Sequence, residues 1–190
     1  MVVGVVGVLA IVAVLALYGG GIVGRSIVPS PTEPSRPATV RFADTLTDVA
    51  ISYPATWVRR IPQDQGIRIL ASSPDGSAGV SVSVRKSGLE PVTSQTLPVV
   101  RSLTDDLLKA DNRIVAVGEP VPVTVGGLPG YKYTYTYRTQ DETEGAHVHY
   151  FLFKAERLVQ VVLQAVPAAR LDALQPTFQR IADTFEGTRR

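Results

Sequence analysis

The chain has 190 residues, 45% of them hydrophobic, and a net charge of only +2 at neutral pH. This length provides one domain of about 150 residues and an N-terminal appendage. Arg25, Glu33 and Arg36 are the only charged residues before residue 40, so the rest of the chain carries 17 basic and 16 acidic residues. A nucleic-acid surface normally needs a basic face, so this balance argues against a nucleic-acid partner.

Cysteine is absent from the sequence. This excludes disulfides, thiolate metal ligands, a cysteine nucleophile and a lipid-modified N-terminal cysteine. The absence of thiols is compatible with an oxidising compartment but does not require one.

Residues 1–23 contain no polar side chain except that of Tyr18. As a helix this segment is roughly 33 Å long, enough to cross a hydrocarbon core of about 30 Å. The alternative is a cleaved signal peptide, but the segment lacks a charged start and a clear A-x-A site, and it is too long. The pattern therefore predicts a single-pass transmembrane anchor over residues 1–24.

Small residues recur at every third position of this segment, where they are candidates for packing against another membrane helix: Gly4, Gly7, Ala10, Ala13 and Ala16. Small side chains let two helices approach closely inside lipid. The alternative is that glycine and alanine are simply common in membrane helices, and a period of three drifts around a helix.

Residues 25–39 include four prolines and predict an extended linker between the anchor and the domain. Arg25 and Arg36 follow the anchor, and the positive-inside rule taken alone places the domain in the cytoplasm. Stalks rich in Pro, Ser and Thr are frequent outside the plasma membrane, and long domains cross regardless of charge. We therefore expect an extracytoplasmic domain, with the cytoplasmic side left open.

The first half of the domain, residues 40–187, has the pattern of short strands. Residues 40–53 predict two strands, residues 66–73 a third that ends in a Pro-Asp-Gly turn, and residues 79–86 a half-buried fourth. Trp57, the only tryptophan, follows the second strand. A lone tryptophan at this place is typical of a core-edge plug, and the alternative is a platform for a ligand or partner.

A helix is expected over residues 96–110, capped by Thr96 with Pro98 in its opening turn. Residues 113–125 return to strand, and Pro120 and Pro122 indicate the edge of a sheet. A closing helix over residues 168–185 has its apolar residues at helical spacing, with a kink or break expected near Gln175 because of Pro176. Residues 188–190 are expected to be a frayed tail.

Residues 127–167 predict three consecutive antiparallel strands, around which the domain is organised. In the first, four tyrosines alternate with polar residues and so share one face: Tyr131, Tyr133, Tyr135 and Tyr137. Two interpretations stay open. The four rings either form the core beneath a helix, or they form an exposed aromatic face, which makes them and Trp57 candidate interaction residues.

Candidate chemistry is sparse. His147 and His149 lie on one face of the second of these strands, but the sequence specifies no third metal ligand, so we expect exposed or half-buried histidines rather than a metal site. Neither a G-x-S-x-G elbow nor a phosphate-binding glycine loop is present. We accordingly assign no catalytic, cofactor-binding or metal-binding residue and expect the protein not to be an enzyme.

Three phrases together resemble the PsbP-like superfamily, in particular the actinobacterial envelope lipoproteins of the LpqN/LpqT type. They are FADTLTDVAISYPATWVRR, VGGLPGYKYTYTY, and FLFKAERLVQVVLQAVPAARLDALQPTFQRIADTF. The resemblance covers about residues 41–185. It implies an α+β fold, an α-β-α sandwich around an antiparallel sheet, and a non-enzymatic docking role. The lipobox cysteine of those lipoproteins is absent here, and the predicted transmembrane helix stands in its place.

These observations predict a membrane-anchored accessory protein of the cell envelope that contacts another membrane or envelope protein. The protein would then be a small subunit of a membrane complex. The alternative function is a binding module for an envelope lipid or glycan that serves transport. A hydrophobic cavity between helix and sheet would favour the alternative, and a filled core would favour the accessory protein.

Overall fold

The computed structural model describes residues 38–64 and 66–187. Within them the strands are β1 (Thr39–Asp44), β2 (Val49–Pro54), β3 (Val58–Arg60), β4 (Ile67–Ser72), β5 (Ala78–Lys86), β6 (Ile114–Val117), β7 (Val121–Val125), β8 (Leu128–Arg138), β9 (Glu144–Lys154) and β10 (Arg157–Ala165). The helices are η1 (Leu97–Val100), α1 (Arg101–Lys109), η2 (Ala168–Arg170) and α2 (Leu171–Asp183).

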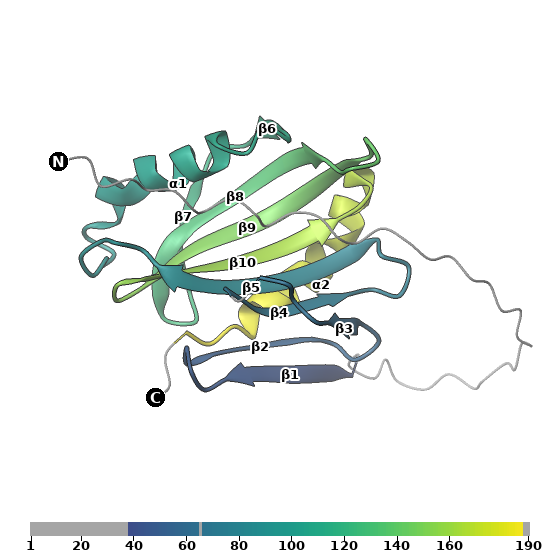
Figure 1. Ribbon diagram of the computed structural model, residues 1–190, viewed down its shortest axis with the longest axis horizontal. Coiled ribbons are helices and arrows are strands. Elements are labelled where there is room, and N and C mark those ends of the chain that lie inside the picture. Colours follow the sequence, from purple (N-terminus) through teal and green to yellow (C-terminus); the bar gives the residue numbers. More distant parts are fainter. Residues whose placement is uncertain (1–37, 65, 188–190) are drawn as a thin grey trace, which may run out of the picture.

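The domain is built on one antiparallel sheet in the order β3-β4-β5-β10-β9-β8-β6, with β7 also paired to β8 (Figure 1). β8, β9 and β10 are the three consecutive strands that the sequence predicts at its centre. β10 lies between β5 and β9 and is buried on both faces, which agrees with its almost continuous apolar sequence. β6 and β7 lie at one edge of the sheet, where Pro120 and Pro122 are tolerated.

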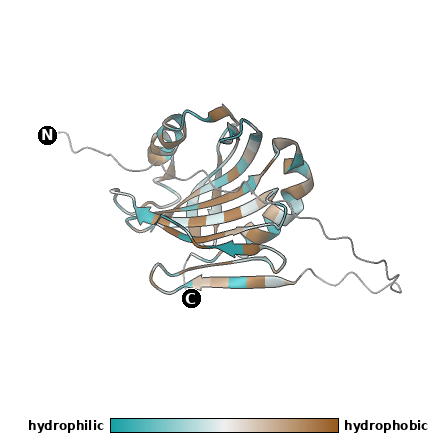
Figure 2. Ribbon diagram, turned by 45° about the vertical axis from the view of Figure 1, so that its right-hand side comes forward, coloured by the Kyte–Doolittle hydropathy of each residue, from teal (hydrophilic) through white to brown (hydrophobic). Residues whose placement is uncertain are grey.

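α1 and α2 cover opposite faces of this sheet, so the predicted α-β-α layering of an α+β fold is confirmed (Figure 1). On one face, Phe178 and Ile181 of α2 pack with Tyr150 and Leu163 of the sheet. On the other, Leu108 of α1 packs with Tyr131, Tyr133 and Tyr135 of β8. Figure 2 shows hydrophobic and hydrophilic residues alternating along several strands, whose successive side chains point to opposite faces of the sheet.

A separate two-stranded sheet, β1 paired with β2, shares the α2 face. Val49, Ile51 and Tyr53 of β2 join the same apolar cluster as α2. The β1–β2 turn is fixed to the main sheet by Lys154, whose ammonium donates to the carbonyl of Thr47 (3.1 Å) and to the carbonyl (2.6 Å) and carboxylate (3.3 Å) of Asp48.

Two details of the helices differ from the sequence expectation. Thr96 does not cap α1: the first turn is the 3₁₀ helix η1, and the Thr96 hydroxyl accepts a hydrogen bond from the Thr93 amide instead. The predicted break at Pro176 does not occur, because α2 continues through it. Pro176 and Asp172 lie on the exposed side of α2, so water can satisfy the Asp172 carbonyl that proline leaves without a donor.

None of the helices in residues 38–64 and 66–187 is long and apolar enough to cross a membrane. The predicted anchor over residues 1–24, its candidate packing residues, most of the linker and the 188–190 tail lie outside the described residues. These expectations remain predictions.

Candidate functional site

The tyrosine ladder of β8 lies beneath α1 rather than on the surface. Tyr131, Tyr133, Tyr135 and Tyr137 are between 1% and 6% exposed. The four rings therefore form part of the core beneath a helix, which is the first of the two interpretations of the sequence. They do not form an exposed aromatic face. Any contact of these residues with a partner stays a prediction.

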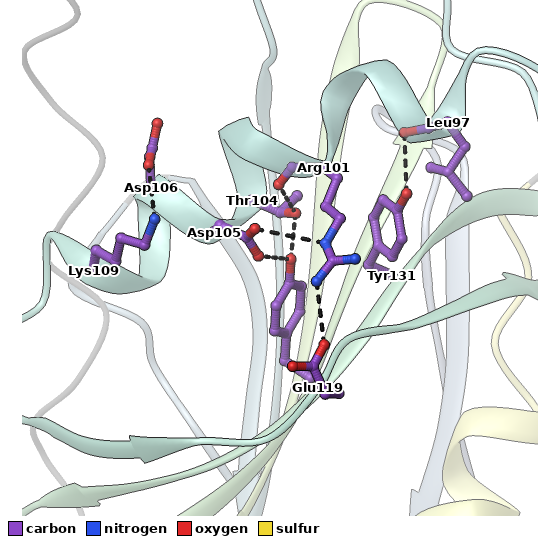
Figure 3. Close-up of polar contacts among 9 residues, drawn as sticks. Leu97, Arg101, Thr104, Asp105, Asp106, Lys109, Glu119 and Tyr131 are labelled. Atoms are coloured by element: carbon purple, nitrogen blue, oxygen red, sulfur yellow. Dashed lines mark hydrogen bonds and ion pairs between the residues drawn. The ribbon is translucent and has the colours of Figure 1, made fainter.

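Tyr133 connects the ladder to α1 through two short hydrogen bonds. Its hydroxyl oxygen lies 2.6 Å from the Thr104 hydroxyl and 2.6 Å from a carboxylate oxygen of Asp105. Arg101, one turn before Asp105, lies 3.7 Å from that carboxylate and 3.2 Å from Glu119, as Figure 3 shows. Burial, together with the bond to Asp105, raises the pKa of Tyr133, which keeps the hydroxyl protonated and able to donate to the carboxylate.

A pocket of about 330 Å³ opens beside this contact, between the end of α1 and the edge strand β6. Its lining combines polar groups with an apolar wall: Asp105, Leu108, Lys109, Asp111, Asn112, Ile114, Val115, Val117 and Tyr133. Pockets that bind small molecules start near this volume. The sequence does not predict this site, and the one local signal for it is the apolar IVAV of β6 on an edge segment.

The rest of the α1 face carries a buried hydrogen-bond network centred on Tyr135. Its hydroxyl oxygen lies 3.0 Å from Nδ1 of His147 and 3.0 Å from Nδ1 of His149. The Nε2 atoms of these histidines lie 3.2 Å and 3.1 Å from the side-chain oxygens of Gln164 and Gln160. β8, β9 and β10 are neighbours in the sheet, and their register brings these five side chains together.

Both histidines are buried and neutral. Burial lowers the pKa of His147 to about 4 and that of His149 to about 3. Their rings are also stacked, His147 on Tyr137 with centroids 4.1 Å apart and His149 on Phe151 at 3.9 Å. The expectation that these residues are exposed or half-buried is therefore wrong, because the side chains of neighbouring strands enclose them.

The number of protons in this network requires the two histidines to carry their protons on different ring nitrogens. If both donate from Nε2 to a glutamine oxygen, both Nδ1 atoms need a donor, and the Tyr135 hydroxyl has only one proton. One histidine must therefore carry its proton on Nδ1 and accept at Nε2 from a turned glutamine amide. Among the described residues the Gln160 amide nitrogen has no hydrogen-bond partner, so Gln160 is the glutamine that turns. Its neighbour His149 is therefore the histidine with the proton on Nδ1.

A metal site at the histidine pair is not supported by the geometry. Among residues 38–64 and 66–187, no group of three or more His, Cys, Asp or Glu side chains could hold a metal ion. The nitrogen atoms that would bind a metal are instead used in hydrogen bonds to Tyr135 and the two glutamines.

Trp57 lies at the other end of the sheet from α1 and the pocket. It is half-buried and packs against the core cluster that β2 and α2 share. This position agrees with the core-edge plug expected from the sequence, and its second interpretation, as an interaction residue, stays a prediction.

Comparison with solved structures places this arrangement among known folds. The solution structure of the PsbP protein of a cyanobacterium, CyanoP from Synechocystis, matches with a TM-score of 0.54 and 14% identity over 83% of this chain and 97% of its own. LpqN of Mycobacterium tuberculosis, a protein involved in cell envelope biogenesis, matches with a TM-score of 0.53 and 12% identity over 83% of this chain and 88% of its own. The chain has a PsbP-like fold.

A third similar structure is a Bacteroides thetaiotaomicron protein, with a TM-score of 0.51 and 12% identity over 78% of this chain and 48% of that one. No protein-family model and no curated protein matches the sequence. At these identities the PsbP-like likeness concerns the fold, and the resemblance seen in the sequence phrases is confirmed at that level.

Proposed function

We propose that this chain is a non-enzymatic, membrane-anchored accessory protein of the cell envelope that works through contact with another membrane or envelope protein. Two observations support the location: the apolar segment 1–24 with its proline-rich linker, and a fold shared with LpqN, which is involved in cell envelope biogenesis. The proposed contact makes the protein a small subunit of a membrane complex.

The observation that carries the proposal is the exposed apolar edge of the sheet. Val115 and Val117 of β6 are 52% and 49% exposed, and both also line the pocket next to α1. Among the described residues β6 pairs only with β8. We call β6 and this pocket the edge surface.

An edge strand of this kind can accept an extended segment of another protein, because its outer backbone groups are free to pair and its side chains give specificity. The pocket then receives one side chain of that segment. Its apolar wall, formed by Leu108, Ile114 and the two valines, suits an aliphatic or aromatic side chain.

The anchor and the edge surface reinforce one another in this proposal. A membrane helix confines the domain to the surface where its partner resides, which raises the effective concentration of a weak second contact. A small edge contact is therefore sufficient for a stable assembly.

The test compares full-length variants in pull-downs from native membranes in mild detergent. Val115→Glu combined with Val117→Glu places two charges on the edge surface and should abolish the capture of a specific partner. Leu46→Glu is the matched control, because Leu46 is 79% exposed in the β1–β2 turn, away from this edge. Equal capture by the wild type, the double variant and the control contradicts a role of the edge surface in binding. If no protein co-purifies with the wild type, the proposal that the chain is a subunit of a complex is contradicted.

A glycan-binding module is the second candidate, favoured by the polar part of the pocket. Asp105 and Asn112 place a carboxylate and an amide around one opening. Titration of envelope oligosaccharides and of short-chain lipids, followed by the amide NMR signals of Asn112 and Val115, tests it. A saturable shift that Asn112→Ala removes supports this candidate, and unchanged signals contradict it.

A further inference from the structure

The described domain begins beside a second exposed surface, at the opposite end of the sheet from β6. The carbonyl of Ala38 accepts a hydrogen bond of 2.8 Å from the amide of Ala55, and Trp57 and β3 follow directly. Figure 1 shows β3 at the edge of the large sheet, on the side where the two-stranded sheet of β1 and β2 lies. Whatever precedes residue 38 is therefore attached beside β3.

The side chains around this point combine exposed apolar and basic groups. Ile61 is 94% exposed, Val58 43% and Val40 42%, and Arg59 and Arg60 between them are also exposed. We call Val40 and residues 58–61 the β3 patch. The register of β3 with β4 places Arg59 opposite Ala71 and Arg60 opposite Leu70, so the two arginines project from opposite faces of the edge.

The β3 patch has a net positive charge that the described part of the chain does not neutralise. Arg59 lies over the Phe42 ring at 5.1 Å, and neither Arg59 nor Arg60 forms an ion pair with a described carboxylate. The nearby acidic groups have other partners: Glu186 pairs with Arg41, Asp44 with Arg68 and Asp64 with Arg85. Two arginines flanked by exposed valine and isoleucine therefore remain available.

We infer that the β3 patch docks on the surface of an anionic lipid bilayer. This inference rests on the membrane anchor of the proposed function, which makes the Ala38 end of the domain the end nearest the membrane. Arginines near an anionic surface are attracted to its phosphates, and exposed apolar side chains enter the headgroup region. Docking there orients the domain so that β6, at the far edge of the sheet, points away from the bilayer.

Trp57 provides the probe, because it is the only tryptophan in the chain and directly precedes the β3 patch. The full-length protein is reconstituted into vesicles of zwitterionic phosphatidylcholine, alone or mixed with anionic phosphatidylglycerol. A fraction of the lipid carries bromine on its acyl chains to quench nearby tryptophan. We expect stronger quenching of Trp57 in the anionic vesicles, and reduced quenching at 0.5 M salt because salt screens the charges.

Arg59→Ala combined with Arg60→Ala should lower the ratio of docked to undocked domain by about fivefold per arginine at low salt. The matched control is Arg138→Ala with Arg157→Ala, which removes the same charge from two exposed residues outside the β3 patch and outside the edge surface. Ile61→Ser is a second test variant, since an almost fully exposed side chain can be changed without affecting the fold. Equal quenching in both kinds of vesicle, or equal loss in test and control variants, overturns the inference.

Flotation of the same samples separates this inference from the proposed function. If the protein floats with phosphatidylcholine vesicles but Trp57 is not quenched in anionic ones, the membrane anchor is supported and the docking of the β3 patch on the bilayer is wrong. If it does not float with phosphatidylcholine, the anchor is wrong. The docking of the β3 patch is then tested by the quenching of Trp57 on the anionic vesicles. If this quenching does not depend on Arg59 and Arg60, the docking is wrong as well.

Discussion

The hydroxyl oxygen of Tyr135 and the Nδ1 atom of His147 lie 3.0 Å apart on neighbouring strands of the sheet. The same hydroxyl lies at an equal distance from Nδ1 of His149, so one tyrosine hydroxyl is the hydrogen-bond partner of two imidazoles. Both histidines are held neutral in the interior, and the stability of the domain therefore depends on their staying neutral.

We expect the free energy of unfolding to decrease as the pH falls below 6.5. The pKa values of His147 and His149 in the folded protein, about 4 and about 3, lie below the unfolded value of 6.5, so the unfolded state binds more protons in this range. Each histidine then costs about 1.4 kcal/mol per pH unit, or about 4 kcal/mol for the pair at pH 5. The carboxyl groups with lowered pKa, such as Asp44 and Asp64, reduce the free energy of unfolding only when the pH falls below about 3.8, the ordinary pKa of an aspartate.

Urea denaturation at pH 7, 6 and 5 measures this dependence. His147→Gln removes one of the two groups and should reduce the slope between pH 6 and pH 5 to about half. A free energy of unfolding that is constant from pH 7 to pH 5 would contradict the buried neutral pair.

The two histidines are expected to adopt opposite tautomers, His147 with its proton on Nε2 and His149 with its proton on Nδ1. Nitrogen-15 NMR of the imidazole rings distinguishes these forms directly. Tyr135→Phe removes the shared hydroxyl, after which both rings should carry the proton on Nε2 and donate to Gln164 and Gln160. Identical tautomers in the wild-type protein would show that the proton count is satisfied in another way.

Tyr133→Phe should destabilise the domain by about 1–3 kcal/mol, because Thr104 and Asp105 each lose a hydrogen-bond partner at 2.6 Å. Tyr131→Phe is the matched control. It removes a hydroxyl from the same ladder that makes one long bond of 3.3 Å to the Leu97 carbonyl, and a loss below about 1 kcal/mol is expected. Chemical denaturation of both variants gives the comparison, and equal losses would mean that the Tyr133 contact does not hold α1 to the sheet.

Lys154→Met should loosen the β1–β2 turn without unfolding the main sheet. The substitution leaves the carbonyls of Thr47 and Asp48 without their donor, while the aliphatic part of the side chain is kept. We expect faster hydrogen exchange of the amides around residues 45–50 and a loss of about 1–3 kcal/mol in global stability. Lys86→Met, an exposed lysine at the end of β5, should change neither quantity.

The large sheet could be predicted because its strands carry their own pattern. The alternation in β8 and the continuous apolar sequence of β10 arise from which faces each strand buries. The edge position of Pro120 and Pro122 followed from the missing amide hydrogen of proline. Helix details were less predictable: Thr96 found a partner in Thr93, and α2 tolerated Pro176 because packing of Phe178 and Ile181 on the sheet outweighs one lost hydrogen bond.

The candidate site was the part that the sequence left open. The pocket joins the end of α1, the Asp111–Asn112 turn and β6, and its shape depends on how a helix crosses a sheet edge. The histidine network has the same origin, since Tyr135, His147 and Gln164 come from three strands whose register is set by pairing. Spacing along one strand gave the shared face of the two histidines, but not what covers them.

The amino-acid sequence by itself determined the near-neutral charge, the apolar segment over residues 1–24, the three central strands and the face that the four tyrosines share, because these depend on composition and local periodicity. Only the tertiary structure decided that the tyrosine face is buried, that the histidines are neutral partners of one hydroxyl, and that Val115 and Val117 are exposed at a pocket. Burial and hydrogen-bond partners are set by segments far apart in the chain, which local patterns do not specify.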